Sequence, residues 1–255
     1  MVTHEVKGLD RFKEHMAGLE DCYALIGGTA CDVLLRDADF DFRATKDIDM
    51  VLLVEGRLPE TAAAVWRLVK TGGYRCGWKG STHAHFYRFT EPSDLSYPVM
   101  IEIFSAAPDF INEDAEIAVA PLPIDDKISS LSAILLDKDY YGFMKESRKV
   151  VNGVAVLDET GLIPFKAKAF LDLSQRKACG EHVDSRDLKK HKNDVLRLAQ
   201  LLRPGHCIDL PTTIAADMTE FCNTIANDEV NMKQLGIPAS YKEIIELIRD
   251  TYRII

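Results

Sequence analysis

The chain has 255 residues, of which 47% are hydrophobic and 28% charged, a composition typical of soluble globular proteins rather than fibrous or disordered ones. Its formal net charge of -9 argues against a surface that is basic throughout. No apolar run approaches the roughly 20 residues of a membrane span, and the start, MVTHEVKGLDRF, lacks the pattern of a secretory signal. We therefore expect a cytoplasmic protein with no membrane partner.

The first strong pattern is a strand, a glycine turn and a helix. Tyr23–Ile26 is a short apolar run that ends at Gly27 and Gly28, and Thr29 follows as the expected N-cap of a helix. Paired glycines let the backbone approach a bulky anion, and the N–H groups of the turn and of the new helix then point toward it. The turn is a candidate phosphate site, although most such pairs are only turns.

Two aspartates open the next strand. The segment KDIDMVLLV (46–54) is dense in aliphatic residues and carries Asp47 and Asp49 at its start. Side chains alternate along a strand, so both carboxylates point to the same face. Two like charges at the edge of an apolar core are costly unless a cation lies between them, and Mg²⁺ binds through one or two carboxylates together with water and phosphate oxygens. The alternative is a pair of solvated strand-entry residues.

A third carboxylate interrupts the apolar strand expected at 97–105. Glu102 lies inside this run, where a glutamate is rarely left unpaired. If this strand lies beside the Asp-x-Asp strand, Glu102 completes a cluster able to hold two metal ions. An ion pair with an arginine such as Arg88 is the alternative.

Strands and helices alternate through the first 160 residues, which predicts an α/β lobe over 1–160. The other elements expected there are a helix within 2–22, a polar loop after Leu35, a helix at 58–69, a strand at 83–89 in a hairpin with 97–105, an edge strand at 117–124, a helix at 128–136, and a hairpin at 149–157 that turns at Asn152-Gly153.

Residues 161–255 are expected to form a separate helical domain. After a charged loop at 158–160, Pro164 marks the expected entrance of a helix that runs to Lys177. Three more amphipathic helices are expected at 184–202, 211–226 and 240–252. The basic residues between 186 and 192 are either a nucleic-acid contact or a solvated face. The predicted class is α+β, a mixed sheet with flanking helices followed by a C-terminal helical bundle.

The motifs together resemble a known superfamily. GGTACDVLL (27–35), then Arg43-Ala-Thr45-Lys-Asp47-Ile-Asp49, then a strand glutamate, resembles the DNA polymerase β-like nucleotidyltransferases. Within it, GGTA followed by R-x-T-x-D-I-D is similar to the AbiEii/AbiGii toxin group of bacterial nucleotidyltransferases. The match is close over 23–54 and loose over most of the chain. The segment KKHKNDVLRL (189–198) resembles the downstream helical motif of that group, in which a basic residue and an aspartate face the site, and this carries over to Lys190, His191 and Asp194.

The resemblance implies a role for each group of residues. It implies that Asp47, Asp49 and Glu102 bind two Mg²⁺ ions and act in catalysis. It also implies a catalytic lysine that meets the nucleotide phosphates, with Lys166 as the candidate and Lys168 as the runner-up. The nucleotide-binding residues that it implies are Gly27, Gly28, Thr29, Arg43, Lys190 and Asp194.

The implied reaction moves a nucleoside monophosphate from an NTP, such as ATP, to an acceptor hydroxyl. In the resembled group the acceptor is an RNA end, commonly tRNA, or a protein, growth inhibition is the outcome, and a cognate antitoxin is a partner. Two alternatives are open for this chain: nucleotidylation of a small molecule such as an aminoglycoside, and a non-catalytic nucleotide-binding module.

Overall fold

The computed structural model describes residues 6–53, 57–80, 85–105, 119–121, 134 and 137–254. Its strands form a mixed eight-stranded sheet in the order β6-β3-β4-β5-β2-β1-β8-β7. The strands are β1 (Tyr23–Ile26), β2 (Asp47–Leu52), β3 (Arg75–Gly80), β4 (His85–Thr90), β5 (Met100–Ser105), β6 (Val119–Pro121), β7 (Arg148–Val151) and β8 (Val154–Leu157). The predicted α+β class is confirmed.

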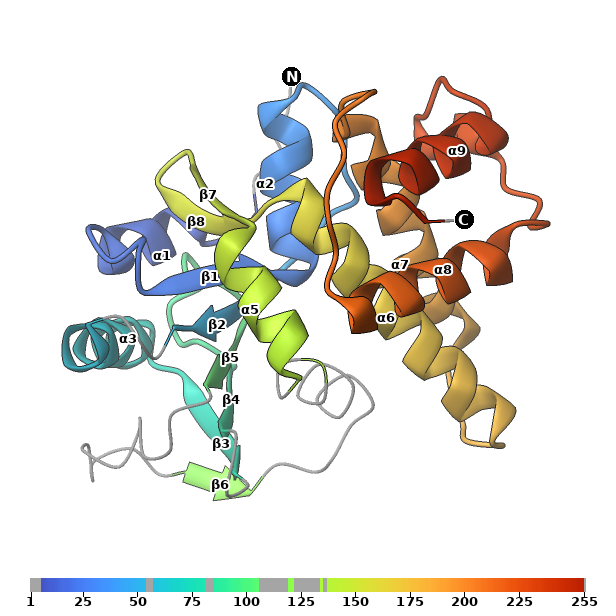
Figure 1. Cartoon of the computed structure of the whole chain (residues 1–255). Helices are drawn as coiled ribbons and strands as arrows, with labels where there is room; N and C mark the ends of the chain where they lie inside the picture. The colour runs from blue at the N-terminus through green and yellow to red at the C-terminus, as the bar shows by residue number, and fades with distance from the viewer. Residues whose placement is uncertain are drawn as a thin grey trace.

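Helices cover both sides of this sheet and continue beyond it. The α-helices are α1 (Leu9–Met16), α2 (Gly27–Asp37), α3 (Leu58–Gly72), α5 (Lys138–Glu146), α6 (Glu159–Ala178), α7 (Ser185–Leu198), α8 (Thr212–Ile225) and α9 (Tyr241–Tyr252), with 3-10 turns η1 (Ala199–Leu201) and η2 (Met232–Leu235). Figure 1 shows α1 and α3 on one side of the sheet and α5 and α6 on the other. No helix in the described part of the chain has the length and apolar character to span a membrane.

One face of the sheet packs against α3. The ring of Trp66 on α3 meets the ring of Phe89 on β4 edge to face, with centroids 6.1 Å apart. Phe89 is in register with Ile101 of β5, and Ile101 is in register with Ile48 of β2. Residues in register share a face, so these three buried apolar side chains belong to the α3 face. Their neighbours along each strand face the opposite side.

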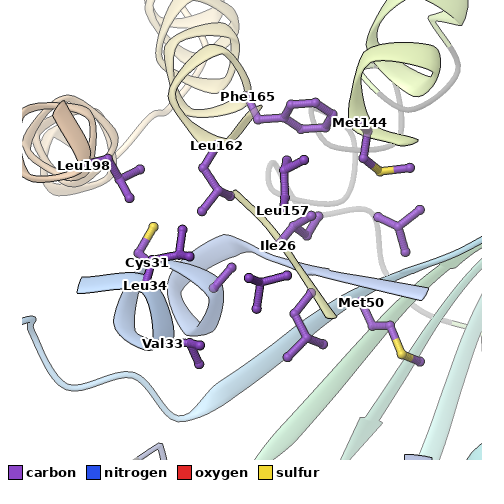
Figure 2. Packing of buried hydrophobic residues seen from close by; sticks show 14 of the residues in the cluster. Ile26, Cys31, Val33, Leu34, Met50, Met144, Leu157, Leu162, Phe165 and Leu198 are labelled. Atoms are coloured by element: carbon purple, nitrogen blue, oxygen red, sulfur yellow. The ribbon is translucent and has the colours of Figure 1, made fainter. Parts of the chain in front are cut away.

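A continuous apolar core joins the sheet to the helical part. Leu162 and Phe165 of α6 lie over Ile26 of β1, and Leu198 of α7 lies beside them (Figure 2). All four side chains are buried. The domain boundary expected at residue 160 falls in the first turn of α6, and the division into two domains stays a prediction.

Most predicted elements are present, with bounds that differ by a few residues. The hairpin turn at Asn152-Gly153 is confirmed, with φ of 48° and 80°, as is the antiparallel pairing of β4 with β5. β6 lies at the sheet edge as expected. β3 and α5 were not predicted. The helix expected at 128–136 lies outside the described residues except for residue 134.

The start of α6 differs from the prediction. The helix begins at Glu159, and the side chain of Asp158 caps it by accepting from the Gly161 N–H at 2.9 Å. Pro164 is therefore inside the helix, and the loop expected at 158–160 is its N-cap and first turn. A proline there cannot donate to the carbonyl of Thr160, four residues earlier. The hydroxyl of Tyr252 on α9 donates to that carbonyl instead, at 2.8 Å, so a distant helix stabilises the proline position.

Truncating Phe221 of α8 to alanine should destabilise the sheet as well as the helices. Phe221 is fully buried and meets the ring of Phe170 on α6 with centroids 5.4 Å apart. Removing such a ring costs about 3–5 kcal/mol. The chain has two tryptophans, Trp66 on α3 and Trp78 on β3, and both belong to the sheet half. Because the core is continuous, we expect the urea midpoint measured by tryptophan fluorescence to fall together with the midpoint measured by far-UV circular dichroism.

Val150→Ala is the control, since Val150 is 60% exposed and its loss should change the free energy of unfolding by less than about 0.5 kcal/mol. An unchanged fluorescence midpoint in Phe221→Ala, with an earlier loss of helical signal, would show instead that the two halves unfold separately.

Candidate functional site

A row of side chains crosses four strands on the face opposite α3. Ile26 of β1 is in register with Asp49 of β2, Asp49 with Glu102 of β5, and Glu102 with Arg88 of β4. β2 and β5 are parallel neighbours, so the strand carrying Glu102 lies beside the Asp-x-Asp strand as predicted. Asp49 and Glu102 are both buried, at 4% and 0% exposure. Asp47, half-buried, shares this face by strand alternation.

Arg88 binds Glu102. Its Nε and Nη2 donate to Oε1 of Glu102 at 2.8 and 2.6 Å, so the ion pair considered as the alternative for Glu102 is present. A buried carboxylate needs such a partner to stay charged. Within the described ranges, no group of three or more His, Cys, Asp or Glu side chains is placed to hold a metal ion. Metal binding by Glu102 therefore stays a prediction. Asp47 and Asp49 are the two carboxylates that remain as candidate metal ligands.

The glycine turn lies directly against the carboxylate of Asp49. Gly27 is the first residue of α2 and has φ +69°, and a Cβ on it would lie 1.9 Å from Oδ2 of Asp49. A Cβ on Gly28 would lie 2.8 Å from the hydroxyl of Thr45. Only a residue without a side chain allows both approaches. The N-terminus of α2, with its N–H groups and the positive end of its dipole, therefore opens beside a buried carboxylate.

Thr29 has a different role from the one predicted. The N-cap position of α2 is Ile26, and no side chain caps this end, so the expectation that Thr29 is the N-cap is wrong. Thr29 is fully buried, and its hydroxyl donates to the carbonyl of Asp47 at 2.6 Å. This bond ties the first turn of α2 to the start of β2, and thus the glycine turn to the aspartate pair.

A second buried carboxylate joins the helical part to the site. Asp194 of α7 is fully buried, and its Oδ2 accepts from Nζ of Lys166 on α6 at 3.0 Å. Arg43, from the loop before β2, donates to both carboxylate oxygens at 3.0 and 3.3 Å. Lys168, the runner-up to Lys166, is instead paired with Asp217 of α8 at 3.1 Å. One aspartate thus holds Lys166 and Arg43 together.

The charges in this group stabilise one another. Burial alone would raise the pKa of Asp194, but Lys166 and Arg43 outweigh burial and hold that pKa well below its usual value. Burial opposes the charge on Lys166, yet Asp194 raises the pKa of its ammonium group. Burial, followed by the positive charge of Lys166, lowers the pKa of His191 to about 3. At neutral pH the lysine and aspartate are therefore charged and His191 is neutral.

A cavity of about 210 Å³ lies between the glycine turn, α6 and α7. Asp49 and both glycines form one wall. Lys166 is the charged side chain contributed by α6, whose other lining residues are apolar. From α7 the cavity receives Asp187, Lys190 and His191.

Several residues predicted for the site therefore meet around one cavity. Asp194 binds the lining residue Lys166 from behind, Arg43 binds Asp194, and Thr29 binds the backbone of Asp47. Asp187 was not predicted. The apolar α6 side chains Phe165, Ala169 and Leu173 were also not predicted for the site. No sequence pattern marked them as cavity walls, because that role depends on where α7 lies.

The approach of Gly27 to Asp49 can be tested with a double-mutant cycle. Gly27→Ala should be destabilising both through its positive φ and through the contact with Oδ2. Gly153→Ala is the matched control, since Gly153 has φ +80° with nothing within 4 Å and should cost about 1–2 kcal/mol. We expect Gly27→Ala to cost at least about 1 kcal/mol more in urea unfolding, and that excess to disappear with Asp49→Ala. An excess that persists without the carboxylate would contradict the proposed contact.

Asp194→Asn should strongly destabilise the protein, because it leaves Lys166 and Arg43 without their buried counter-charge, a loss of about 3–5 kcal/mol. Because the pKa of Asp194 is lowered in the folded protein, its stabilising effect is fully present above the unfolded aspartate pKa of about 4. That stabilisation decreases as the pH falls below this value. Urea unfolding of both proteins across pH 3–8 measures the difference. Asp209→Asn, at an exposed ion pair with Arg253, should cause no change, and a difference independent of pH would contradict the assignment.

Comparison with known proteins adds little to this geometry. No family model matches the chain, and no curated protein matches it. Among solved structures, an antigenic nucleotidyltransferase-like protein from Paracoccidioides brasiliensis is similar, with a TM-score of 0.46 and 14% identity over 96% of this chain and 95% of that one. A likeness of this strength assigns neither a family nor an activity to the chain.

Proposed function

We propose that the chain is a nucleotidyltransferase that moves a nucleoside monophosphate from an NTP to an acceptor hydroxyl. The observation that carries this proposal is the cavity in which the Gly27-Gly28 turn and Asp49 lie opposite Lys166 and Lys190. A helix N-terminus with two lysines suits the negative phosphates of a nucleotide. A carboxylate in the same cavity suits the metal that accompanies them.

The carboxylates fit a cation that arrives with its nucleotide. Asp47 and Asp49 would hold Mg²⁺ while phosphate and water oxygens complete its shell, and bound Mg²⁺ supplies neutralisation of the triphosphate charge and activation of the acceptor hydroxyl. Glu102 as a third ligand, and with it a second ion, would have to bind through Oε2 or displace Arg88 from Oε1. Both belong to the proposal rather than to the observed geometry.

The other residues of the site would position the nucleotide and neutralise the charge of its phosphates. Lys166 would contact the phosphates from α6, in a direction fixed by its bond to Asp194. Arg43 and Asp194 would act by holding Lys166, since Asp194 is fully buried. The two glycines would leave room for phosphate oxygens beside Asp49. Fixed charges of this kind lower the barrier by positioning the reactants and by stabilising the charge of the transition state.

RNA is the acceptor that we propose, and two exposed lysines near the cavity support it. Lys177 and Lys189 are exposed where α6 and α7 are joined, on the same helices as the cavity residues Lys166 and Lys190. In a chain with a net charge of -9, such basic side chains favour a polyanionic acceptor. An aminoglycoside is itself cationic and gains nothing from them. A toxin role with a cognate antitoxin is supported by the sequence resemblance alone, and growth inhibition by the wild type, absent in Asp49→Asn, would support it.

Transfer of label from α-³²P NTPs tests the activity. In the presence of Mg²⁺ and total tRNA, we expect the wild-type protein to label RNA, and Asp49→Asn to lower the rate by at least about 100-fold, because it removes a charge from the reaction centre. Asp41→Asn, an exposed aspartate of the preceding loop, is the matched control and should leave the rate unchanged.

Other outcomes of the same assay separate the alternatives. Label on a protein in cell extract would replace RNA by a protein acceptor, and label on a small molecule alone would favour the aminoglycoside-type reaction. NTP binding with no transfer to any acceptor would support a non-catalytic module. Transfer that Asp49→Asn does not reduce would contradict the proposed site.

A further inference from the structure

The cavity has an inner and an outer end, which follow from the pairing of α6 with α7. The two helices are joined by the short segment between Cys179 and Asp184, and Lys166 of α6 is bound to Asp194 of α7. The two helices therefore run antiparallel, so that Leu173 of α6 lies at the same level as Asp187 of α7. At 1.5 Å per residue, the seven residues from Lys166 to Leu173 span about 10 Å along the helix.

The two ends of the cavity differ in chemistry. The inner end, at the glycine turn and Lys166, offers backbone N–H groups and positive charge. Farther out, α6 contributes the apolar side chains Ala169 and Leu173, while α7 contributes His191, Lys190 and Asp187. The α6 side of the cavity therefore has the same division as a nucleotide, which carries charged phosphates at one end and a flat, mostly uncharged nucleoside at the other. An apolar helix face suits the surface of a base.

His191 carries a polar atom that the described part of the protein leaves unpartnered. Its Nδ1 is buried and has no hydrogen-bond partner among the described residues. The same is true of Nε1 of Trp66 and Oε1 of Gln200. Of these three side chains, His191 alone is among the residues that line the cavity. Buried polar atoms are nearly always hydrogen-bonded, and a ligand in the cavity would supply the partner that Nδ1 lacks if the ring turns toward it.

The charge state of His191 limits what that ligand group can be. Burial and the neighbouring Lys166 lower its pKa to about 3, while Lys190 and Arg43 also disfavour the imidazolium and Asp194 favours it. At neutral pH the ring carries no charge to offer a phosphate. It is also too weak a base to take a proton from an acceptor hydroxyl efficiently. An uncharged hydrogen-bonding group fits it best.

We propose that Nδ1 of His191 recognises the nucleoside part of the nucleotide, through a ribose hydroxyl or the edge of the base, while Ala169 and Leu173 of α6 cover the base. The inference rests on the proposed function and extends it from the phosphates to the nucleoside. It makes His191 a specificity-determining residue and leaves phosphate binding to Lys166 and the glycine turn.

Binding measured by calorimetry with two ligands tests this role. The ligands are the NTP that binds best among ATP, GTP, CTP and UTP, and inorganic triphosphate, which lacks the nucleoside. We expect His191→Leu to weaken NTP binding about 5- to 10-fold, the effect of one net hydrogen bond, and to leave triphosphate binding unchanged. His191→Asn, whose amide places a hydrogen-bonding atom near the position of Nδ1, should recover most of the affinity.

Gln200→Leu is the matched control, because it removes another buried unpartnered atom from a side chain that is not among the described lining residues, and it should change neither affinity. Unchanged triphosphate binding also shows that the His191→Leu protein is folded. The same comparison with the 2′-deoxynucleotide assigns the contact, since a loss that vanishes there points to the ribose and a loss that persists points to the base.

Three results would overturn the inference. An equal loss for triphosphate would mean that His191 contacts phosphate, and no loss for either ligand would mean that it contacts nothing in the nucleotide. Wild-type protein that binds NTP no more tightly than triphosphate would show that the nucleoside is not recognised, while the phosphate site stands. Binding of neither ligand would instead contradict the proposed function itself.

Discussion

A fully buried carboxylate dictates how the helical part meets the sheet. Asp194 lies out of contact with water, and a charge there is tolerable only with cations bound to it. Lys166 of α6 and Arg43 of the loop before β2 supply them. Because these residues come from three separate segments, satisfying one aspartate fixes two helices and the loop around the glycine turn. The cavity is the space that this arrangement leaves between them.

The row of polar side chains across the sheet also contains buried carboxylates, and the two have different surroundings. Glu102 lies deeper and is bound by Arg88 of the neighbouring strand. Asp49, next to it in register, lines the cavity. The sheet thus places Glu102 against Arg88 and Asp49 at the wall of the cavity. The Gly27 approach, which no other residue type would permit, brings a helix N-terminus to that second acid.

Sequence patterns predicted the elements whose signals are local. The Gly-Gly turn between β1 and α2, the Asn152-Gly153 hairpin and the placement of Asp49 beside Glu102 all follow from short motifs and strand alternation. β3, with the sequence RCGWKG, was missed because two glycines and two charges hide its pattern. The start of α6 and the role of Thr29 depend on Tyr252 and Asp47, which are distant in sequence, and no local pattern reports them. Arg88 was considered as a partner of Glu102, but the choice between that ion pair and a metal depends on which side chains meet across the strands.

The hydrogen bond from Tyr252 to Thr160 has a consequence for how the protein is made. The first turns of α6 carry Pro164 and lead directly into Lys166, and the carbonyl of Thr160, which the proline leaves without its helical donor, accepts from Tyr252 of α9. Ribosomes release the chain from its N-terminal end, so about ninety residues must follow Thr160 before its partner emerges. A nascent chain would therefore contain all the described strands of the sheet while the helix that carries Lys166 still lacked a supporting contact. Any activity would come late in synthesis.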